Sequence, residues 1–219
     1  VCSNLASNKY MLSYLIKNDN KVFKYIDFLT ISNAQDVVDV ILREIYNPPI
    51  CLYIKGNKEN LNTISIAVIG CRECSNYGKE VGQKLSYDLA KTNVTIVSGL
   101  AKGIDSYAHL GALYAKGKTI AVLGCGLDTI YPKENMYLAQ KILEKNGTII
   151  SEYPVGTKIE KINFPLRNRI ISGISQGVVV VEAKRKSGTL STVDFALEQG
   201  RNVFVVPRKY QFFKFRGVK

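Results

Sequence analysis

Three short apolar segments, each ending in glycine or in serine followed by glycine, recur between residues 64 and 127. They lie at 64–69, 94–97 and 119–123 and are rich in β-branched residues, a pattern typical of strands buried on both faces of a parallel sheet. Amphipathic segments with a helical repeat of apolar residues separate them. A strand, a glycine turn, a helix and a second strand make a βαβ unit, and two successive units predict a doubly wound α/β sheet.

The rest of the chain continues this alternation. We predict a helix at 134–145, a strand at 147–151, a loop at 152–166, a short helix at 167–175, a strand at 178–181, a helix beginning near 188 and a strand at 202–206. The strand at 178–181 is the most apolar, which predicts a central place in the sheet. Residues 1–46 have helical character, and 50–55 alternate as an edge strand would. The predicted organisation is a partial helical domain at 1–46, a doubly wound, mostly parallel domain at 47–207, and an atypical basic and aromatic tail at 208–219.

The chain is strongly basic, with 30 lysine and arginine residues against 18 acidic residues and a formal net charge of +12. An excess of this size indicates a polyanionic partner such as nucleic acid, although a general bias toward solubility gives the same balance. No segment approaches the roughly 20 apolar residues that span a bilayer, and the first residues lack a signal-peptide pattern. We therefore expect a cytoplasmic protein that does not enter a membrane.

The five cysteines are an odd number, which favours reduced thiols. Cys71 and Cys74 form a C-x-x-C pair, but a zinc site needs two further ligands, and the chain has no second pair and one histidine. We expect no metal. The single His109 lies mid-helix, where a structural role is expected. Glu152 and Glu182 stand near strand ends without an evident partner for acid–base chemistry.

Two glycine turns follow the first two strands. In Gly70-Cys71-Arg72, glycine permits a tight turn, backbone N–H groups at the next helix start can hold a phosphate, and Arg72 adds a planar fork of donors. Arg72 occupies the second glycine position of the dinucleotide fingerprint, so we expect no nicotinamide or flavin cofactor. The turn at 98–105 carries Lys102 between glycines. It either holds an anion or simply begins a helix whose dipole favours Asp105.

The most specific local indication of a binding site is the stretch Phe164-Pro165-Leu166-Arg167-Asn168-Arg169. With a loop ending at the proline, Arg167 and Arg169 would bracket the first turn of a helix, where the dipole disfavours cations unless an anion binds there. Phe164 offers a ring on which a base could stack. The alternative is an exposed basic turn with Phe164 in the core.

Two further basic segments each allow two interpretations. Three cations at 184–186 precede Ser187-Gly188-Thr189 at a predicted helix N-terminus, which makes either a phosphate cradle or a solvated loop. In the tail at 208–219, aromatic residues alternate with cations, as on surfaces that bind single strands, but a frayed chain end has the same composition.

As a set, these motifs resemble the DprA/Smf family, the DNA-processing proteins of bacterial natural transformation. The resemblance covers about residues 48–207, in order and at the spacing of the family. It rests on NPPICLYIKGN, IAVIGCR, YGKEVGQKLSYDLA, VSGLAKGIDSYAHLGAL, TIAVLGCGLDTIYPKEN, ISEYPVGT, FPLRNRIISG and VVVEAKRKSGTLSTVDFALEQGRNVFVVP.

The resemblance implies an extended Rossmann fold that binds single-stranded DNA without strong sequence preference and without catalysis. It also implies a homodimer that protects incoming strands and helps to load RecA on them. Carried over residue by residue, it assigns to the DNA site Gly70, Arg72, Phe164, Arg167 and Arg169, with Lys102, Ser187, Gly188 and Thr189 as weaker members.

The chain departs from the family pattern in three places. Cys71 stands where serine is usual, and 208–219 replace a segment that helps to form the family's dimer and RecA surfaces. The third departure lies at the two ends, where we expect a partial N-terminal helical domain and no counterpart of the winged-helix-like domain of many members.

An enzyme of the phosphoribohydrolase group is the alternative, but such enzymes carry a carboxylate three residues after the Gly-Thr pair. Thr192 stands there, so a glycosidic cleavage lacks its base.

Overall fold

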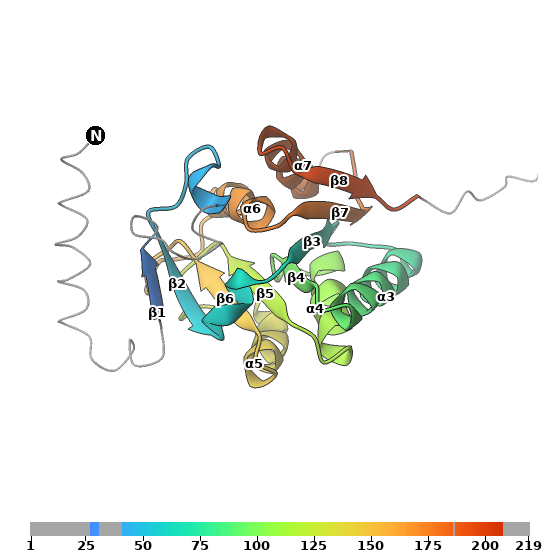
Figure 1. The fold of residues 1–219 in the computed structure, drawn as a ribbon, viewed down its shortest axis with the longest axis horizontal. Coiled ribbons are helices and arrows are strands. Elements are labelled where there is room, and N and C mark those ends of the chain that lie inside the picture. Colours follow the sequence, from blue (N-terminus) through green and yellow to red (C-terminus); the bar gives the residue numbers. More distant parts are fainter. Residues whose placement is uncertain (1–26, 31–40, 186, 208–219) are drawn as a thin grey trace, which may run out of the picture.

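A computed structural model describes residues 27–30, 41–185 and 187–207 (Figure 1). Within them, eight strands form one sheet in the order β1-β2-β6-β5-β4-β3-β7-β8. Strands β3 to β8 are parallel to their neighbours in this set. Strands β1 and β2 are antiparallel additions beside β6. The structure confirms the Rossmann-like, mostly parallel α/β sheet that the sequence predicts.

The elements fall close to their predicted places. The strands are β1 (Asp27–Thr30), β2 (Cys51–Gly56), β3 (Ser65–Gly70), β4 (Thr95–Ser98), β5 (Thr119–Leu123), β6 (Thr148–Ser151), β7 (Gly177–Glu182) and β8 (Asn202–Val205). The helices are η2 (Lys58–Asn62), α3 (Asn76–Lys91), α4 (Ile104–Tyr114), η3 (Lys133–Asn135), α5 (Met136–Glu144), α6 (Asn163–Gly173) and α7 (Gly188–Glu198), of which η2 and η3 are short 3-10 helices.

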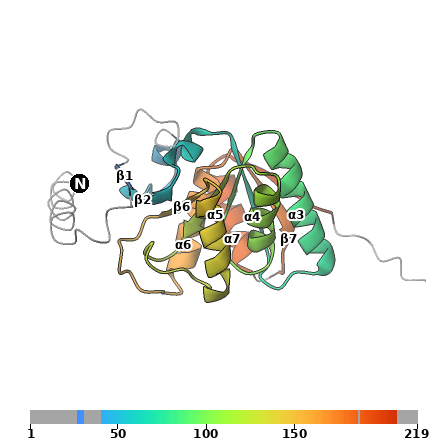
Figure 2. The same ribbon diagram turned by 90° about the horizontal axis from the view of Figure 1, so that it is seen from below.

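Helices cover both faces of the sheet. Figure 2 shows α3, α4 and α5 side by side on one face, and Figure 1 shows α6 and α7 on the other. Every residue of β4 and β5 is buried, which accounts for their continuous apolar sequences. The predicted apolar face of α4, with Ile104, Ala108 and Ala112, is fully buried against the sheet.

The order of the strands reverses at β3. From β3 the chain builds β4, β5 and β6 outward in one direction, and it then returns to place β7 on the other side of β3. Ligands of open α/β sheets bind beyond the carboxyl ends of the strands at such a reversal. The turns that follow β3 and β7 therefore flank the expected binding position.

Two predictions about strand positions are wrong. Strand β7 is not central, because it lies between β3 and the outer strand β8. Its apolar sequence is explained by helices on both faces, since its residues join the core clusters on either side of the sheet. Strand β2 is not an edge strand, because β1 pairs with it.

Residues 27–30 are a strand rather than part of the predicted helical domain. An uncovered strand edge offers a row of backbone partners, which can outweigh a weak local preference for helix. Of the remaining residues of that domain, 41–46 are described; 41–43 are helical, and Leu42 and Ile45 pack into the core beside Ile170 and Ile171. Residues 1–26, 31–40 and the tail at 208–219 lie outside the described residues.

The single histidine is part of the core, as the sequence predicts. The Nδ1 atom of His109 lies 2.7 Å from Thr119 Oγ1, which itself donates to Ile96 O at 2.8 Å. Nδ1 is therefore the donor. Burial, aided by the nearby Arg167 charge, lowers the pKa of His109 to about 3, so the ring is neutral.

In the described part of the chain, no helix combines the length and the apolar character needed to cross a bilayer.

Candidate nucleic-acid interface

A cleft of about 560 Å³ opens at the carboxyl edge of the sheet, beyond β3 and β7. Seven of the nine residues that the sequence assigns to the binding site line it: Gly70, Arg72, Phe164, Arg167, Ser187, Gly188 and Thr189. Lys102 lines a small adjoining pocket that also contacts Arg72 and Phe164. Arg169 lines neither cavity. Residues more than 100 positions apart in the chain thus meet at the edge that the strand order predicts.

The turn that carries Arg72 is held from two sides. Cys71 N donates to Glu182 O at 2.7 Å, which ties the turn to the end of β7. On the other side, Gly103 has a φ of +77°, and a Cβ atom there would overlap the carbonyl oxygens of Cys71 and Arg72. Only glycine therefore lets the turn before α4 pack this closely against the turn that presents Arg72.

Aromatic rings form the wall of the cleft next to Arg72. The Arg72 guanidinium carbon lies 6.0 Å from the centre of the Phe164 ring, and the Tyr131 ring lies 5.2 Å from Phe164 at an interplanar angle of 42°. Arg72 is exposed and has no carboxylate partner among the described residues. A free guanidinium beside two rings can contact a phosphate while a base lies on the aromatic surface.

Arg167 is buried, with 5% of its surface exposed. Its Nη1 atom donates to Gly99 O at 2.9 Å and also to Val122 O. A Cβ atom on Gly99 would lie 2.7 Å from Nη2, so the guanidinium fits only because residue 99 is glycine. Arg167 therefore joins the ends of β4 and β5 and reaches the cleft as part of its floor.

A buried carboxylate lies beside this guanidinium. Asp105 accepts hydrogen bonds from Gly99 N at 3.1 Å and Ala101 N at 3.4 Å. Burial raises the pKa of Asp105, while the Arg167 charge and the two N–H groups oppose the rise. Burial lowers the pKa of Arg167 to about 10, partly offset by Asp105, so the guanidinium stays charged at neutral pH.

Arg169 is a structural residue of α6. Its Nη1 and Nη2 atoms donate to Glu152 Oε1 at 2.7 Å and Oε2 at 2.6 Å, and its Nε atom donates to Asn47 O at 2.8 Å. Both partners of this ion pair are largely buried. The Arg169 side chain therefore joins α6 to the end of β6 and is committed within the protein, away from the cleft.

The sequence argument for Arg167 and Arg169 as first-turn cations is wrong. Helix α6 begins at Asn163, so both arginines lie beyond its first turn and are balanced inside the protein rather than by a bound anion. Glu152 and Glu182, for which the sequence shows no evident partner, both have partners in the structure. Glu152 pairs with Arg169, and Glu182 accepts from Ser75 N at 3.0 Å and Ser75 Oγ at 2.9 Å.

Two lysines at the cleft are paired with acids. Lys102 Nζ lies 2.6 Å from Glu134 Oε1, and Lys184 Nζ lies 2.6 Å from Glu73 Oε2. Lys184 and Glu73 both line the main cleft and come from the turns after β7 and β3. Their ion pair therefore joins two turns that are 111 residues apart in the chain.

At the far side of the cleft, the first turn of α7 is fixed by α6. Asn168 Nδ2 donates to Gly188 O at 3.2 Å and to Ser191 Oγ at 2.9 Å. Ser187 is the N-cap, but its side chain makes no capping hydrogen bond. The N-terminus of α7 therefore faces the cleft with open donors, as the phosphate-cradle interpretation requires.

Both cysteines of the C-x-x-C pair are free thiols, and Cys71 lines the cleft. Burial is the main reason that the pKa values of Cys71 and Cys74 are raised, which disfavours the reactive thiolate. Within residues 27–30, 41–185 and 187–207, no group of histidine, cysteine and acidic residues is arranged to hold a metal ion.

Sequence reasoning missed several residues of the site: Tyr131, Lys161, Asn168, Glu73 and Asp105 line the cleft. Tyr131 carries no local signal, because only its contact with Phe164 places it in the site. Asp105 gave a usable signal, because a carboxylate just after a glycine turn can hold the N–H groups of that turn.

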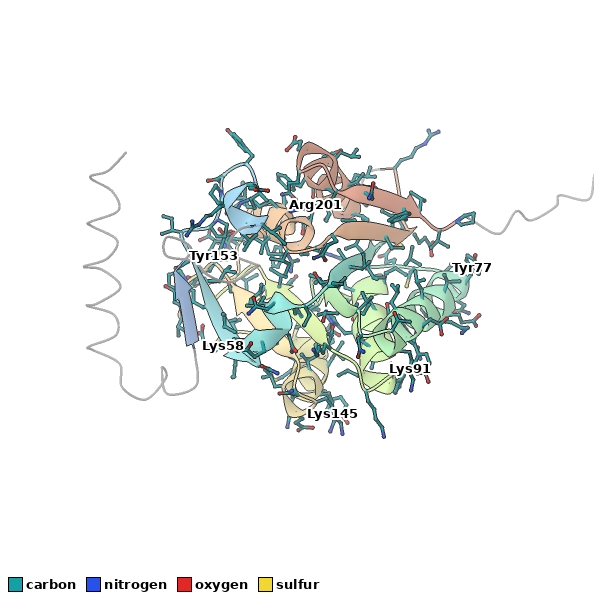
Figure 3. All side chains as sticks on the ribbon, in the orientation of Figure 1. Lys58, Tyr77, Lys91, Lys145, Tyr153 and Arg201 are labelled. Atoms are coloured by element: carbon teal, nitrogen blue, oxygen red, sulfur yellow. The ribbon has the colours of Figure 1, made fainter. Side chains whose placement is uncertain are left out.

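Part of the positive charge lies far from the cleft. Lys58, Lys91 and Lys145, labelled in Figure 3, follow β2 or end α3 and α5, so they lie at the opposite edge of the sheet. The net charge alone therefore does not locate the binding site.

The fold and the cleft define a Rossmann-like protein with a cleft at its strand reversal. The family model of DNA recombination-mediator protein A matches residues 30–219. The chain therefore belongs to the DprA/Smf family.

The sequences of two DprA proteins support this family membership. The chain is 46% identical to DNA processing protein DprA of Streptococcus pneumoniae over 82% of its own length and 63% of that protein. It is 47% identical to DprA of Bacillus subtilis over 76% of its length and 56% of that protein. The chain thus spans about three fifths of the length of these relatives.

Two solved structures have the same fold. The crystal structure of DprA from Streptococcus pneumoniae matches with a TM-score of 0.78 and 40% identity, over 93% of this chain and 71% of that one. DprA from Helicobacter pylori, described for its unique single-stranded DNA binding mode, matches with a TM-score of 0.75 and 32% identity, over 85% and 82% of the two chains.

We expect Arg169→Met to lower the free energy of unfolding by about 3–5 kcal/mol, because the Glu152 carboxylate then stays buried without a counter-charge. Urea denaturation followed by circular dichroism measures this. The double variant Arg169→Met/Glu152→Gln is the control and should regain part of the loss. A single variant as stable as the parent would show that Arg169 is not structural.

Proposed function

We propose that this chain binds single-stranded DNA in the cleft at the carboxyl edge of the sheet. The observation that carries this proposal is the meeting of an unpaired Arg72 with the Phe164 ring, opposite the open N-terminus of α7. Phosphates would contact Arg72 and the N–H groups of α7, and a base would stack on the aromatic wall for about 1–3 kcal/mol. None of these contacts reads a base edge, so little sequence preference is expected.

Within this site, Arg167 acts on the DNA indirectly. Its guanidinium is occupied by Gly99 O and Val122 O, so it shapes the floor and adds positive charge from below. Lys102, Lys184 and Lys161 are exposed, and the first two can turn toward a phosphate by exchanging their carboxylate partner for it. Arg169 has no part in binding in this proposal.

The relatives support a role in DNA uptake. Because the family is that of DNA recombination-mediator protein A, we propose that the chain protects incoming single strands in natural transformation and helps to load RecA on them, in the cytoplasm. The binding described for the Helicobacter pylori relative supports single-stranded DNA as the ligand.

We propose binding without catalysis. A phosphoribohydrolase-like reaction needs a free carboxylate at the helix that follows the Gly-Thr pair, and Thr192 occupies that position. Glu152 and Glu182 are held in structural hydrogen bonds, which leaves neither as a free base.

Replacing Arg72 by alanine should weaken oligo-dT binding by about five- to tenfold at low salt and reduce the slope of log affinity against log salt by about 1, because one phosphate contact is lost. Fluorescence anisotropy at several salt concentrations measures both. Lys118→Ala is the matched control, since Lys118 is exposed at the opposite edge of the sheet. Equal losses in the two variants would place the strand outside this cleft.

Replacing Glu73 by glutamine should tighten oligo-dT binding by about two- to fivefold, because a like charge leaves the cleft and Lys184 no longer has to exchange a partner. The control is Glu80→Gln, which changes the net charge equally on the exposed side of α3. If both variants bind alike, the ion pair does not compete with the strand.

We also propose a homodimer that uses β8 and α7. Strand β8 is the outermost parallel strand of the described sheet, and it exposes Phe204 and Val205 beside Leu197 of α7. An apolar strand edge of this kind favours pairing with a second copy. The contact with RecA is proposed from the family alone.

Light scattering should give twice the chain mass of 24.4 kDa, and Phe204→Asp should shift the mass toward the monomer. Lys118→Asp, just before the interior strand β5 and away from β8, should leave the mass unchanged. A monomeric parent at tens of micromolar would refute the dimer.

A further inference from the structure

The end of the cleft beside α7 contains hydroxyl groups that the protein does not use. Thr189 and Thr192 are only 8% and 2% exposed, and both line the cleft. Neither side chain has a hydrogen-bond partner among the described residues, and Ser187 Oγ is buried without one. Buried polar groups are nearly always paired, so the buried and unpaired Ser187 Oγ indicates a missing partner, and the Thr189 and Thr192 hydroxyls in the same part of the cleft are free to bind the same group.

The backbone around these hydroxyls offers further donors. Helix α7 has no side-chain cap and no acid in its first turn. The carbonyl of Gly188 is fixed by Asn168 and Ser191, which holds the first turn in place. A Cβ atom on Gly188 would meet nothing within 4 Å, so the space before these donors is open. The dipole at a helix N-terminus favours a negative group in that space.

The hydroxyl groups lie along one side of α7. Thr192 lies one helical turn beyond Thr189, and Ile69 and Ile171 also line the cleft. A phosphodiester has two ester links and two free oxygens, whereas a phosphomonoester has a single link and three terminal oxygens. The hydroxyls and the free N–H groups of α7 match those oxygens, and a cleft of about 560 Å³ has room for one nucleotide.

We propose that this recess, formed by Ser187, Gly188, Thr189 and Thr192, binds the phosphomonoester group of a nucleotide. The group comes either from the phosphorylated end of a DNA strand or from a free nucleoside monophosphate. The strand-end source rests on the proposed function, while the free-nucleotide source does not depend on it.

The first experiment compares oligonucleotides that differ at their ends. Full-length protein is titrated with dT20 carrying a 5′- or 3′-phosphate, with dT20 ending in hydroxyls, and with hydroxyl-ended dT21, which adds its extra phosphate as a diester. One phosphorylated dT20 should bind about tenfold tighter than both hydroxyl-ended strands, because hydrogen bonds to a charged group are strong. In parallel, dTMP binding is measured by calorimetry and by displacement of labelled dT20.

Variants then assign the preference to the recess. Thr192→Val keeps the shape of the side chain and should abolish the tenfold ratio and dTMP binding, while Thr192→Ser should keep them. Thr92→Val makes the same change at the end of α3, outside the cleft, and should keep both as well. Thermal unfolding checks each fold, and Thr189→Val substitutes if Thr192→Val is unstable.

The outcomes separate this proposal from the proposed function. A phosphate preference lost in Thr192→Val supports the strand end, and dTMP binding lost in that variant supports the free nucleotide. Equal binding of all strands with no dTMP binding overturns the proposal, even if dT20 binds well. Failure of dT20 to bind would refute the proposed function, and calorimetry with dTMP would still test the recess.

Discussion

The backbone of the buried residue Gly99 is held between two opposite charges, those of Asp105 and Arg167, and the rest of the cleft depends on this contact. Asp105 accepts the N–H of Gly99, and Arg167 donates to its carbonyl, so both backbone groups of this residue are fixed by side chains rather than by a neighbouring strand. Each charge makes the burial of the other tolerable, because an isolated buried ion is costly. The turn after β4 therefore has one available conformation, and Gly103 in that turn supports the backbone that presents Arg72.

The arrangement limits how many cations remain for a ligand. Lys102 is paired with Glu134 and Lys184 with Glu73, and Arg169 is committed to Glu152 away from the cleft, so part of the positive charge in this region is already balanced. Arg72 is the cation that combines a free guanidinium with an aromatic neighbour. Binding in such a site depends on stacking and on backbone donors as much as on charge, which explains why the net charge of +12 indicated the kind of ligand but not its position.

The sequence was sufficient for the parallel strands and for most of the cleft, because apolar segments that end in glycine mark both the strands and the turns at their carboxyl ends. It failed where a partner distant in the chain decides the outcome. The sequence predicts a loop that ends at Pro165. A proline also fits the first turn of a helix, however, and α6 begins at Asn163. That shift moves Arg167 and Arg169 into the interior, where Gly99 and Glu152 determine their roles. No local pattern identifies those partners.

The glycines of the site divide into two kinds. At Gly99 and Gly103 the space for a Cβ atom is filled by the protein itself, so the need for glycine is internal. At Gly188 the backbone has no positive φ, and a Cβ atom would meet nothing within 4 Å, so neither conformation nor packing requires glycine. An alanine would also suit a helix better there. Gly188 therefore leaves the space before the first turn of α7 open to a ligand, and the hydroxyl groups of Thr189 and Thr192 line the same cleft.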